Sequence, residues 1–252
     1  MKFDITQLLA DWDYQPGQVV ARRFMGEDGA EKVQLRVDLG LLQMNAEGRP
    51  DGKRPMGHDS WYDFHLDRLA KHQEEHGDDE SFELDGESCV RLQQEAIQFH
   101  HRYICFFQLE DYTSVERDCD RNLAVFELVA QYAANEELAW SLLQLVPQLL
   151  MMRTRARGTA ALKRRKFAAA CKAIEEGITE IEEFYRDNER EDLLENSGEV
   201  ASLRHWLGEI KAKRPLSALE KLQRQLDEAI RVEDYEKAAK VRDEMKKLQA
   251  SE

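Results

Sequence analysis

The chain has 252 residues, 42% of them hydrophobic and 34% charged, and a formal net charge of −14 at pH 7. Nucleic acid and anionic membranes repel so acidic a chain unless a local basic patch reverses the field. No apolar run approaches the ~20 residues of a membrane-spanning helix, and the first residues lack the apolar stretch of a secretory signal. The sequence therefore predicts a cytoplasmic protein that does not bind membranes.

Glycine, proline and alternating apolar residues set residues 1–57 apart from the rest of the chain. Three segments have the period of β-strands: residues 19–24, 32–39 and 41–44. In the second segment, alternate apolar side chains are expected to share one face: Val33, Leu35, Val37 and Leu39. Asp28 and Gly29 are typical of a hairpin turn, so we predict a small antiparallel β-meander closed by the loop 48–57.

Residues 58–200 show the apolar spacing of amphipathic helices. Ser60 and Asn135 are suited to cap helix N-termini, and Pro147 is expected to break or kink the helix that begins near Glu136. The other helices are expected at about residues 61–76, 87–109, 112–134, 151–164 and 167–186. The central region is therefore predicted to be a helical bundle or a stack of helical hairpins.

A short signature occurs three times between amphipathic helices, with an aromatic residue three positions before a small or β-branched one. We interpret it as the turn of an αα-hairpin, in which the ring fills the closed end and the smaller residue lets the helices approach. The pairs are Tyr112 with Val115, Phe167 with Ala170, and Tyr235 with Ala238.

The middle copy, residues 158–178, also resembles a tetratricopeptide repeat (TPR). Its matching positions are Gly158, Leu162, Phe167 and Ala170. It departs from that pattern at Ile174, where an aromatic residue is usual, and at Gly177, where alanine is usual. The two interpretations of the centre are therefore a TPR-like array and an ordinary helical bundle.

Residues 203–252 are predicted to form a helical hairpin. Ser217 and Glu220 have capping-box spacing. The first helix carries one apolar stripe, made of Leu219, Leu222, Leu226, Ala229 and Ile230. After the turn at residues 232–235, the second helix is supplied by Ala238, Ala239, Val241, Arg242, Met245 and Leu248.

The segment LEKLQRQLDEAIRVEDYEKAAKVRDEMKKLQ resembles the UVR motif, which occurs in the excision-repair proteins UvrB and UvrC, in Clp-type ATPases and in the McsA adaptor. The residues that carry the likeness are Asp234, Tyr235, Glu236, Ala238, Ala239, Arg242 and Asp243. The sequence departs from the motif at Glu233, where leucine is usual. The resemblance implies a helical hairpin that pairs with a second UVR hairpin, in another protein or in a second copy of this chain.

Physical size supports the same expectation, because two short helices cannot bury all their apolar surface against each other. We expect a partner to contact Leu226, Ile230, Tyr235, Ala238, Ala239, Arg242, Asp243 and Met245. Arg242 and Asp243 are interpreted either as a polar clamp at that junction or as a solvated surface pair. Residues 34–57 also resemble the N-terminal region of UVR-motif proteins from planctomycete-like bacteria, a likeness that implies no particular chemistry.

One part of the chain is basic without any intervening acid. Its residues are Arg153, Arg155, Arg157, Lys163, Arg164, Arg165 and Lys166. They are expected to pair with the acidic segment 189–199; the alternatives are contact with an acidic partner peptide or with nucleic-acid phosphates. No aromatic residues alternate with them, which disfavours base stacking. A smaller group, Arg49, Lys53 and Arg54, lies on the loop 48–57 and suggests a possible anion site.

Three histidines, His65, His72 and His76, share one face of a predicted helix, and the last two have the spacing of helical zinc ligands. We expect surface histidines and keep a metal site as the alternative. The sequence has no glycine-rich phosphate loop and no GxSxG elbow, so we predict no catalytic residue and no cofactor. The function predicted is a non-enzymatic adaptor or scaffold acting through the UVR hairpin. The alternative is a protein associated with DNA repair that contacts nucleic acid through residues 153–166.

Overall fold

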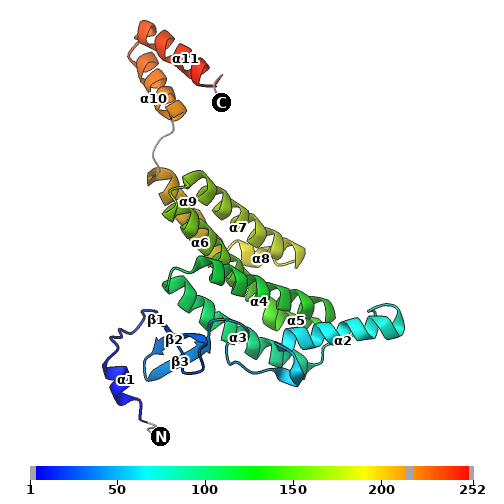
Figure 1. Ribbon diagram of the computed structural model, residues 1–252. Coiled ribbons are helices and arrows are strands. Elements are labelled where there is room, and N and C mark those ends of the chain that lie inside the picture. Colours follow the sequence, from blue (N-terminus) through cyan, green and yellow to red (C-terminus); the bar gives the residue numbers. More distant parts are fainter. Residues whose placement is uncertain (1–3, 214–217, 250–252) are drawn as a thin grey trace. The chain divides into compact units, whose positions relative to one another are not determined.

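The computed structural model describes residues 4–213 and 218–249, and the side chains of residues 218–220 and 247–249 are outside the description. The chain divides into two compact units, residues 1–207 and 208–252, which are treated separately below. It is mainly helical with one small antiparallel sheet near the N-terminus, as the sequence predicts (Figure 1).

The predicted β-meander is confirmed. After the short helix α1 (Thr6–Ala10), strands β1 (Val20–Met25), β2 (Glu31–Val37) and β3 (Gly40–Asn45) pair antiparallel in sequence order. The hairpin between β1 and β2 turns at Gly29, whose φ of +77° favours glycine. The sheet packs on helix α3 (Gly86–Gln108).

The expected alternation of β2 is only half right. Val33 and Leu35 are buried, but Leu39 is 89% exposed because it lies in the turn after the strand. The opposite face is covered too, since Gln34 is 5% and Arg36 is 9% exposed. Two guanidinium groups stack there on aromatic rings, Arg22 on Trp12 and Arg36 on Tyr14. Both faces of β2 are therefore buried.

Helix α2 (Trp61–His76) begins where predicted, because the Ser60 hydroxyl accepts a hydrogen bond from the backbone N–H of Asp63 at 3.0 Å. Helices α3 and α4 (Tyr112–Tyr132) follow. Asn135 caps α5 (Glu136–Leu143) by accepting the N–H of Leu138. Pro147 then lies in the first turn of α6 (Val146–Lys163), where its missing N–H costs nothing, so this helix begins five residues earlier than expected.

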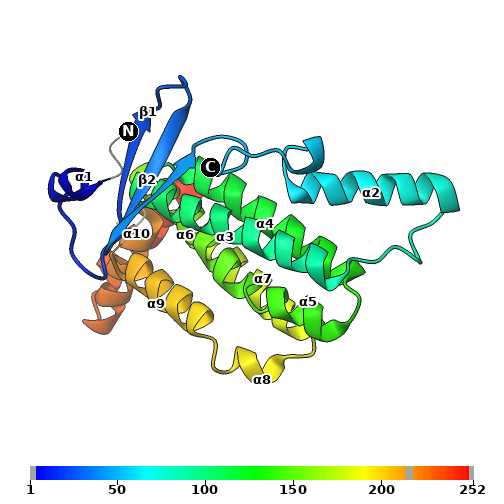
Figure 2. The same ribbon diagram turned by 90° about the horizontal axis from the view of Figure 1, so that it is seen from below.

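Helices α7 (Phe167–Asp187), α8 (Glu191–Leu194) and α9 (Gly198–Lys213) complete the central region. Helix α3 packs on α4, α4 on α6, and α6 on α7 (Figures 1 and 2). Close approach depends on Gly177 of α7, where a Cβ atom would lie 1.9 Å from Thr154 Oγ1 of α6. The sequence missed α8, which is only four residues long, and it assigned residues 203–213 to the C-terminal hairpin region, whereas they belong to α9.

The three repeated turns share one backbone geometry. The residue two positions before each aromatic has a left-handed φ: +62° at Glu110, +57° at Arg165 and +58° at Glu233. In each turn the next backbone N–H bonds back to a carbonyl five residues earlier, which satisfies a group that the helix end leaves free. The smaller residues lie in the interfaces, with Val115 and Ala170 fully buried and Ala238 9% exposed. A fourth such turn, at Glu189, was not foreseen.

Candidate functional site

The candidate site is the C-terminal hairpin of α10 (Ala218–Arg231) and α11 (Tyr235–Gln249). The N–H of Asp234 donates to the carbonyl oxygen of Ala229 at 2.8 Å and closes the turn. The Asp234 carboxylate then accepts the N–H of Lys237 at 3.0 Å and caps α11. Glu233, the departure from the motif, occupies the left-handed position of this turn, with a φ of +58°, and is exposed.

Small side chains fill the interface between the two helices. Ala229 is fully buried, Val241 is 6% exposed and Ala238 is 9% exposed. Because these side chains are short, the helix axes can approach closely. Ala238, expected on the partner-facing surface, therefore lies inside the hairpin and sets its spacing.

Larger apolar side chains at the turn end of the hairpin are exposed. The exposed fractions are 53% for Ile230, 57% for Val232 and 70% for Tyr235. The expectation that the Tyr235 ring fills the closed end is wrong. Tyr235 is the first residue of α11, and Cβ atoms tilt towards the helix N-terminus, so its ring projects past the interface.

The other residues predicted to contact a partner differ in burial. Leu226 and Met245 are half-buried, whereas Ala239, Arg242 and Asp243 are exposed. Arg242 and Asp243 form no ion pair within the described part of the chain. The capping box at Ser217 and Glu220 and the side chains of Leu219 and Leu248 lie outside the described residues.

Three of the seven basic residues, Arg153, Arg157 and Lys163, pair with acids, but not with acids of the segment 189–199 as expected. Their partners lie on α4, on α7 and in the turn that precedes α4. Arg153 bonds to Asp120 at 2.8 Å and to Glu180 at 2.6 Å. Arg157 pairs with Glu116, Lys163 pairs with Glu110, and Arg155 donates to Ser202 and stacks on Trp206.

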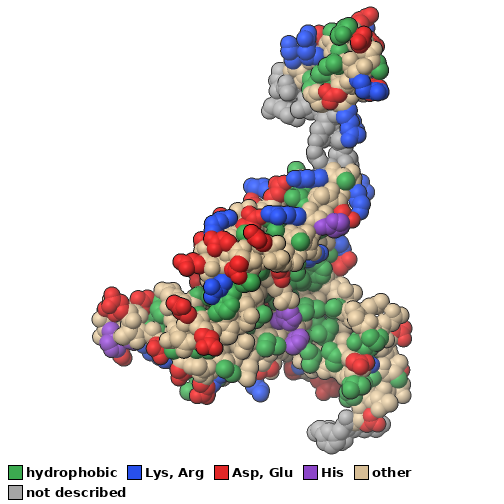
Figure 3. Space-filling view, turned by 180° about the vertical axis from the view of Figure 1, so that it is seen from behind, with side chains coloured by type: hydrophobic (Ala, Val, Ile, Leu, Met, Phe, Trp, Pro, Cys, Tyr) green, Lys and Arg blue, Asp and Glu red, His purple; other side chains and the backbone are tan. Residues whose placement is uncertain are grey.

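Three adjacent cations remain at the α6–α7 turn: Arg164, Arg165 and Lys166. All are exposed, and none has an ion-pair partner among the described residues. In Figure 3, basic and acidic side chains are interspersed over the visible surface rather than gathered into a single-sign patch. Of the seven basic residues in this group, these three are the ones that remain available, within the described structure, to an acidic ligand or to phosphates.

The possible anion site on the loop 48–57 is not formed. Arg49 Nε lies 2.8 Å from Glu95 Oε1, and Arg54 pairs with Asp59 at 2.8 Å. Glu95 is fully buried and also pairs with Arg121. The loop arginines are therefore engaged by the protein's own carboxylates, and only Lys53 of the three remains exposed without a pair in the described structure.

A cavity of about 300 Å³ beside this loop is lined by four arginines and four carboxylates. They are Arg49, Arg102, Arg117, Arg121, Glu47, Asp59, Asp63 and Asp118. Because the formal charges balance, the cavity has no excess positive charge to attract an anion. The residues that line it hold the loop on α3 and α4.

The three histidines of α2 do not converge. Burial leaves His65 1% exposed and lowers its pKa to about 4, and its Nδ1 lies 3.0 Å from the Arg68 guanidinium. His72 and His76 stack with ring centroids 4.2 Å apart, but His76 Nδ1 is bonded to the carbonyl of His72. No cluster of three or more ligating side chains suited to a metal occurs in the described ranges.

The cysteines are free thiols, and Cys171 is half-buried while the other three are buried. Burial raises the pKa of Cys89 to about 11 and that of Cys105 to about 12. Protonated, enclosed thiols are poor nucleophiles. The described structure therefore gives the three buried cysteines a packing role.

Comparison with known proteins identifies one motif in this chain. The UvrB/uvrC motif (UVR) matches residues 217–251, a segment that contains helices α10 and α11 of the hairpin. No curated protein and no solved structure matches the chain. The likenesses to a TPR array and to the planctomycete-like group thus find no support. None of the described helices is long and apolar enough to cross a membrane.

Proposed function

We propose that this chain is a non-enzymatic interaction protein that docks a second UVR hairpin through α10 and α11. The observation that carries the proposal is the exposed apolar group Ile230, Val232 and Tyr235 at the turn of a UVR hairpin. Tyrosine is suited to such a role, because it brings a large apolar area with few rotatable bonds.

The hairpin has a physical reason to associate. Two helices of 14 and 15 residues are marginal in water, and their interface here is built from small side chains. A second hairpin placed on Ile230, Val232 and Tyr235 would remove that surface from water at roughly 25 cal/mol per Å². The partner in this proposal is a hairpin of the same type, in a UVR-bearing protein or in a second copy of the chain.

The test measures binding of the full chain to purified UvrB and UvrC, together with its own self-association by analytical ultracentrifugation. Tyr235→Ala is expected to weaken whichever association occurs by at least tenfold, because the ring is 70% exposed and does not support the hairpin interior. The matched control is Lys237→Ala, which shortens an exposed side chain two residues away without removing an aromatic ring.

A chain ending at residue 213 provides the second comparison. It should neither self-associate nor bind either UVR protein. Binding that is unchanged by this truncation or by Tyr235→Ala would contradict the docking proposal.

The competing function is contact with DNA through Arg164, Arg165 and Lys166. About three phosphate contacts would give a slope of log K against log salt concentration near −3. Binding through so few contacts is weak at physiological salt. The formal charge of −14 opposes that association further. We expect no measurable binding to a random duplex at about 150 mM salt. The DNA function would be favoured instead if the chain bound the duplex tightly and Gln substitutions at all three positions abolished that binding.

A further inference from the structure

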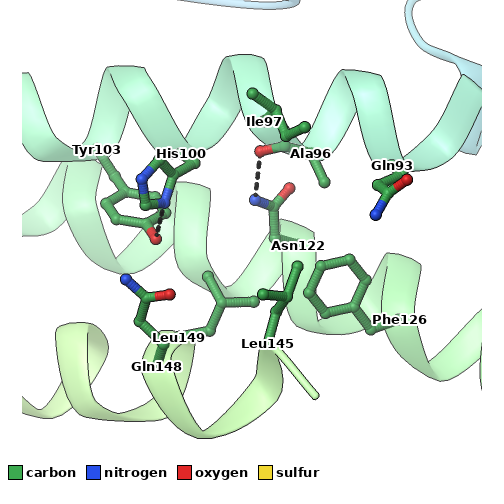
Figure 4. Close-up of a pocket in the computed structure, with 10 residues that line it drawn as sticks. All are labelled: Gln93, Ala96, Ile97, His100, Tyr103, Asn122, Phe126, Leu145, Gln148 and Leu149. Atoms are coloured by element: carbon green, nitrogen blue, oxygen red, sulfur yellow. Dashed lines mark hydrogen bonds between the residues drawn. The ribbon is translucent and has the colours of Figure 1, made fainter. Parts of the chain in front are cut away.

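A groove of about 330 Å³ lies between α3, α4 and the start of α6, in the unit formed by residues 1–207 (Figure 4). This volume is at the lower end of the range for small-molecule pockets. Its lining residues include none from the UVR hairpin and none from the basic turn 164–166. It therefore represents a feature that the proposed docking function does not use.

The centre of the groove is apolar. Phe126 and Leu149 form its buried wall, at 2% and 4% exposed, while Ile97 and Leu145 stand at its edge with 46% and 36% of their surfaces exposed. An apolar ligand would cover the exposed parts of Ile97 and Leu145, which is a favourable transfer from water.

Polar groups lie at both ends of this apolar centre. Figure 4 shows Gln93 at one end, and His100, Tyr103 and Gln148 at the other. His100 Nδ1 and the Tyr103 hydroxyl are hydrogen-bonded at 2.6 Å.

The side-chain amides of Gln93 and Gln148 differ from the Asn122 amide in the same groove. Asn122 donates to the carbonyl of Ala96 at 2.9 Å, whereas Gln93 and Gln148 have no side-chain partner among the described residues. Each free amide offers donors and an acceptor to a bound molecule. The two ends of the groove can thus bind a ligand that has an apolar centre and a hydrogen-bonding group at each end.

No lining residue is Asp, Glu, Lys or Arg, although such residues make up 34% of the chain. Burial lowers the pKa of His100, with the neighbouring His101 acting in the same direction, so the imidazole is neutral at pH 7. A charged ligand would lose hydration here without gaining a counter-charge. The groove therefore discriminates against ions.

We propose that this groove binds a small uncharged ligand that has an apolar ring system and amide-type or lactam-type hydrogen-bonding groups. Gln93 binds one end of the ligand. Gln148, with the hydrogen-bonded pair of His100 and Tyr103 beside it, binds the other. The apolar body lies against Ile97, Leu145 and Leu149.

The test uses the full chain with labelled Ile and Leu methyl groups, titrated with benzamide, indole-3-carboxamide and 2-quinolone. The matched charged probes are benzoate, indole-3-carboxylate and quinoline-2-carboxylate. At least one uncharged probe is expected to shift the methyl resonances of Ile97, Leu145 and Leu149 at millimolar concentration or below. The carboxylates should bind at least tenfold more weakly.

Gln93→Ala and Gln148→Ala should each weaken the binding of that uncharged probe by threefold or more. The control is Gln94→Ala, which changes an exposed neighbour of Gln93 outside the groove and should leave binding unchanged. Equal binding of amides and carboxylates, no shifts with any uncharged probe, or insensitivity to both glutamine substitutions would overturn the proposal. So would shifts of the same methyl groups caused by self-association of the chain without a probe.

Discussion

Arg102 of α3 and Asp118 of α4 form a two-point ion pair in which each residue is only 1% exposed. Arg102 Nε and Nη2 lie 2.7 and 2.8 Å from the two carboxylate oxygens of Asp118. The remaining Arg102 nitrogen, Nη1, donates to the carbonyl oxygens of Asn45 and Gly48 at 3.0 and 2.7 Å. One buried side chain therefore joins two helices to the end of the sheet and to the loop that follows it.

Breaking this pair should be costly. Asp118→Asn leaves the Arg102 charge buried without a full counter-charge, and we expect the free energy of unfolding to fall by about 3–5 kcal/mol. Urea denaturation measures the change. Lys172→Ala is the control, because its pair with Glu176 is exposed and 3.5 Å long, and it should alter stability by less than about 0.5 kcal/mol. Equal effects of the two substitutions would show that the buried pair does not support the fold.

The contact between Gly177 and Thr154 leads to a second prediction. Gly177→Ala places a methyl group within 2.7 Å of the Cβ atom of Thr154, a residue that is only 2% exposed. We expect a loss of about 1–2 kcal/mol after allowing for the better helix propensity of alanine. Gly208→Ala in α9 is the matched control, because nothing lies within 4 Å of its added Cβ atom. It should stabilise the protein by up to about 1 kcal/mol.

Stability should depend on pH through His65. Its pKa is about 4 in the folded chain, against about 6.5 when unfolded, so the unfolded chain binds more protons between these values. The stability contributed by the neutral ring is present above pH 6.5 and is lost as the pH falls towards 4, by up to about 3 kcal/mol.

His65→Phe removes the titrating group and should reduce the slope of unfolding free energy against pH in this window. His76→Gln, which changes an exposed ring on the same helix, should leave the slope as it is. Thermal or urea unfolding at half-unit pH steps provides the measurement. A slope that is the same in wild type and His65→Phe would exclude His65 as its source.

Substitutions in the hairpin can distinguish residues that stabilise its fold from residues that bind a partner. Ala238→Leu inserts a larger side chain between α10 and α11 and should destabilise the hairpin by about 1–3 kcal/mol. Amide hydrogen exchange across residues 222–246 of the full chain should become faster. Ala239→Leu, at an exposed position, should leave exchange close to wild type, as should Tyr235→Ala. Accelerated exchange in Tyr235→Ala would mean that the ring supports the hairpin rather than a partner.

The sequence by itself determined the features that depend on residues a few positions apart. The caps at Ser60 and Asn135, the break before Pro147 and the turn before Tyr235 were all readable, because side chain and backbone partner are local. The hairpin was readable for the same reason, since its turn and its small interface residues lie within about 20 positions.

Only the tertiary structure decided which distant groups meet. Sequence alone could not pair Arg157 with Glu116 or Lys163 with Glu110, because the chain has many acids and only folding decides which of them comes close to each cation. The burial of both faces of β2 and the uncharged groove on α3, α4 and α6 likewise arise from segments far apart in sequence. Local sequence patterns predict which residues share a helix face. Tertiary packing decides which other element that face contacts and which side chains remain free for a ligand or a partner.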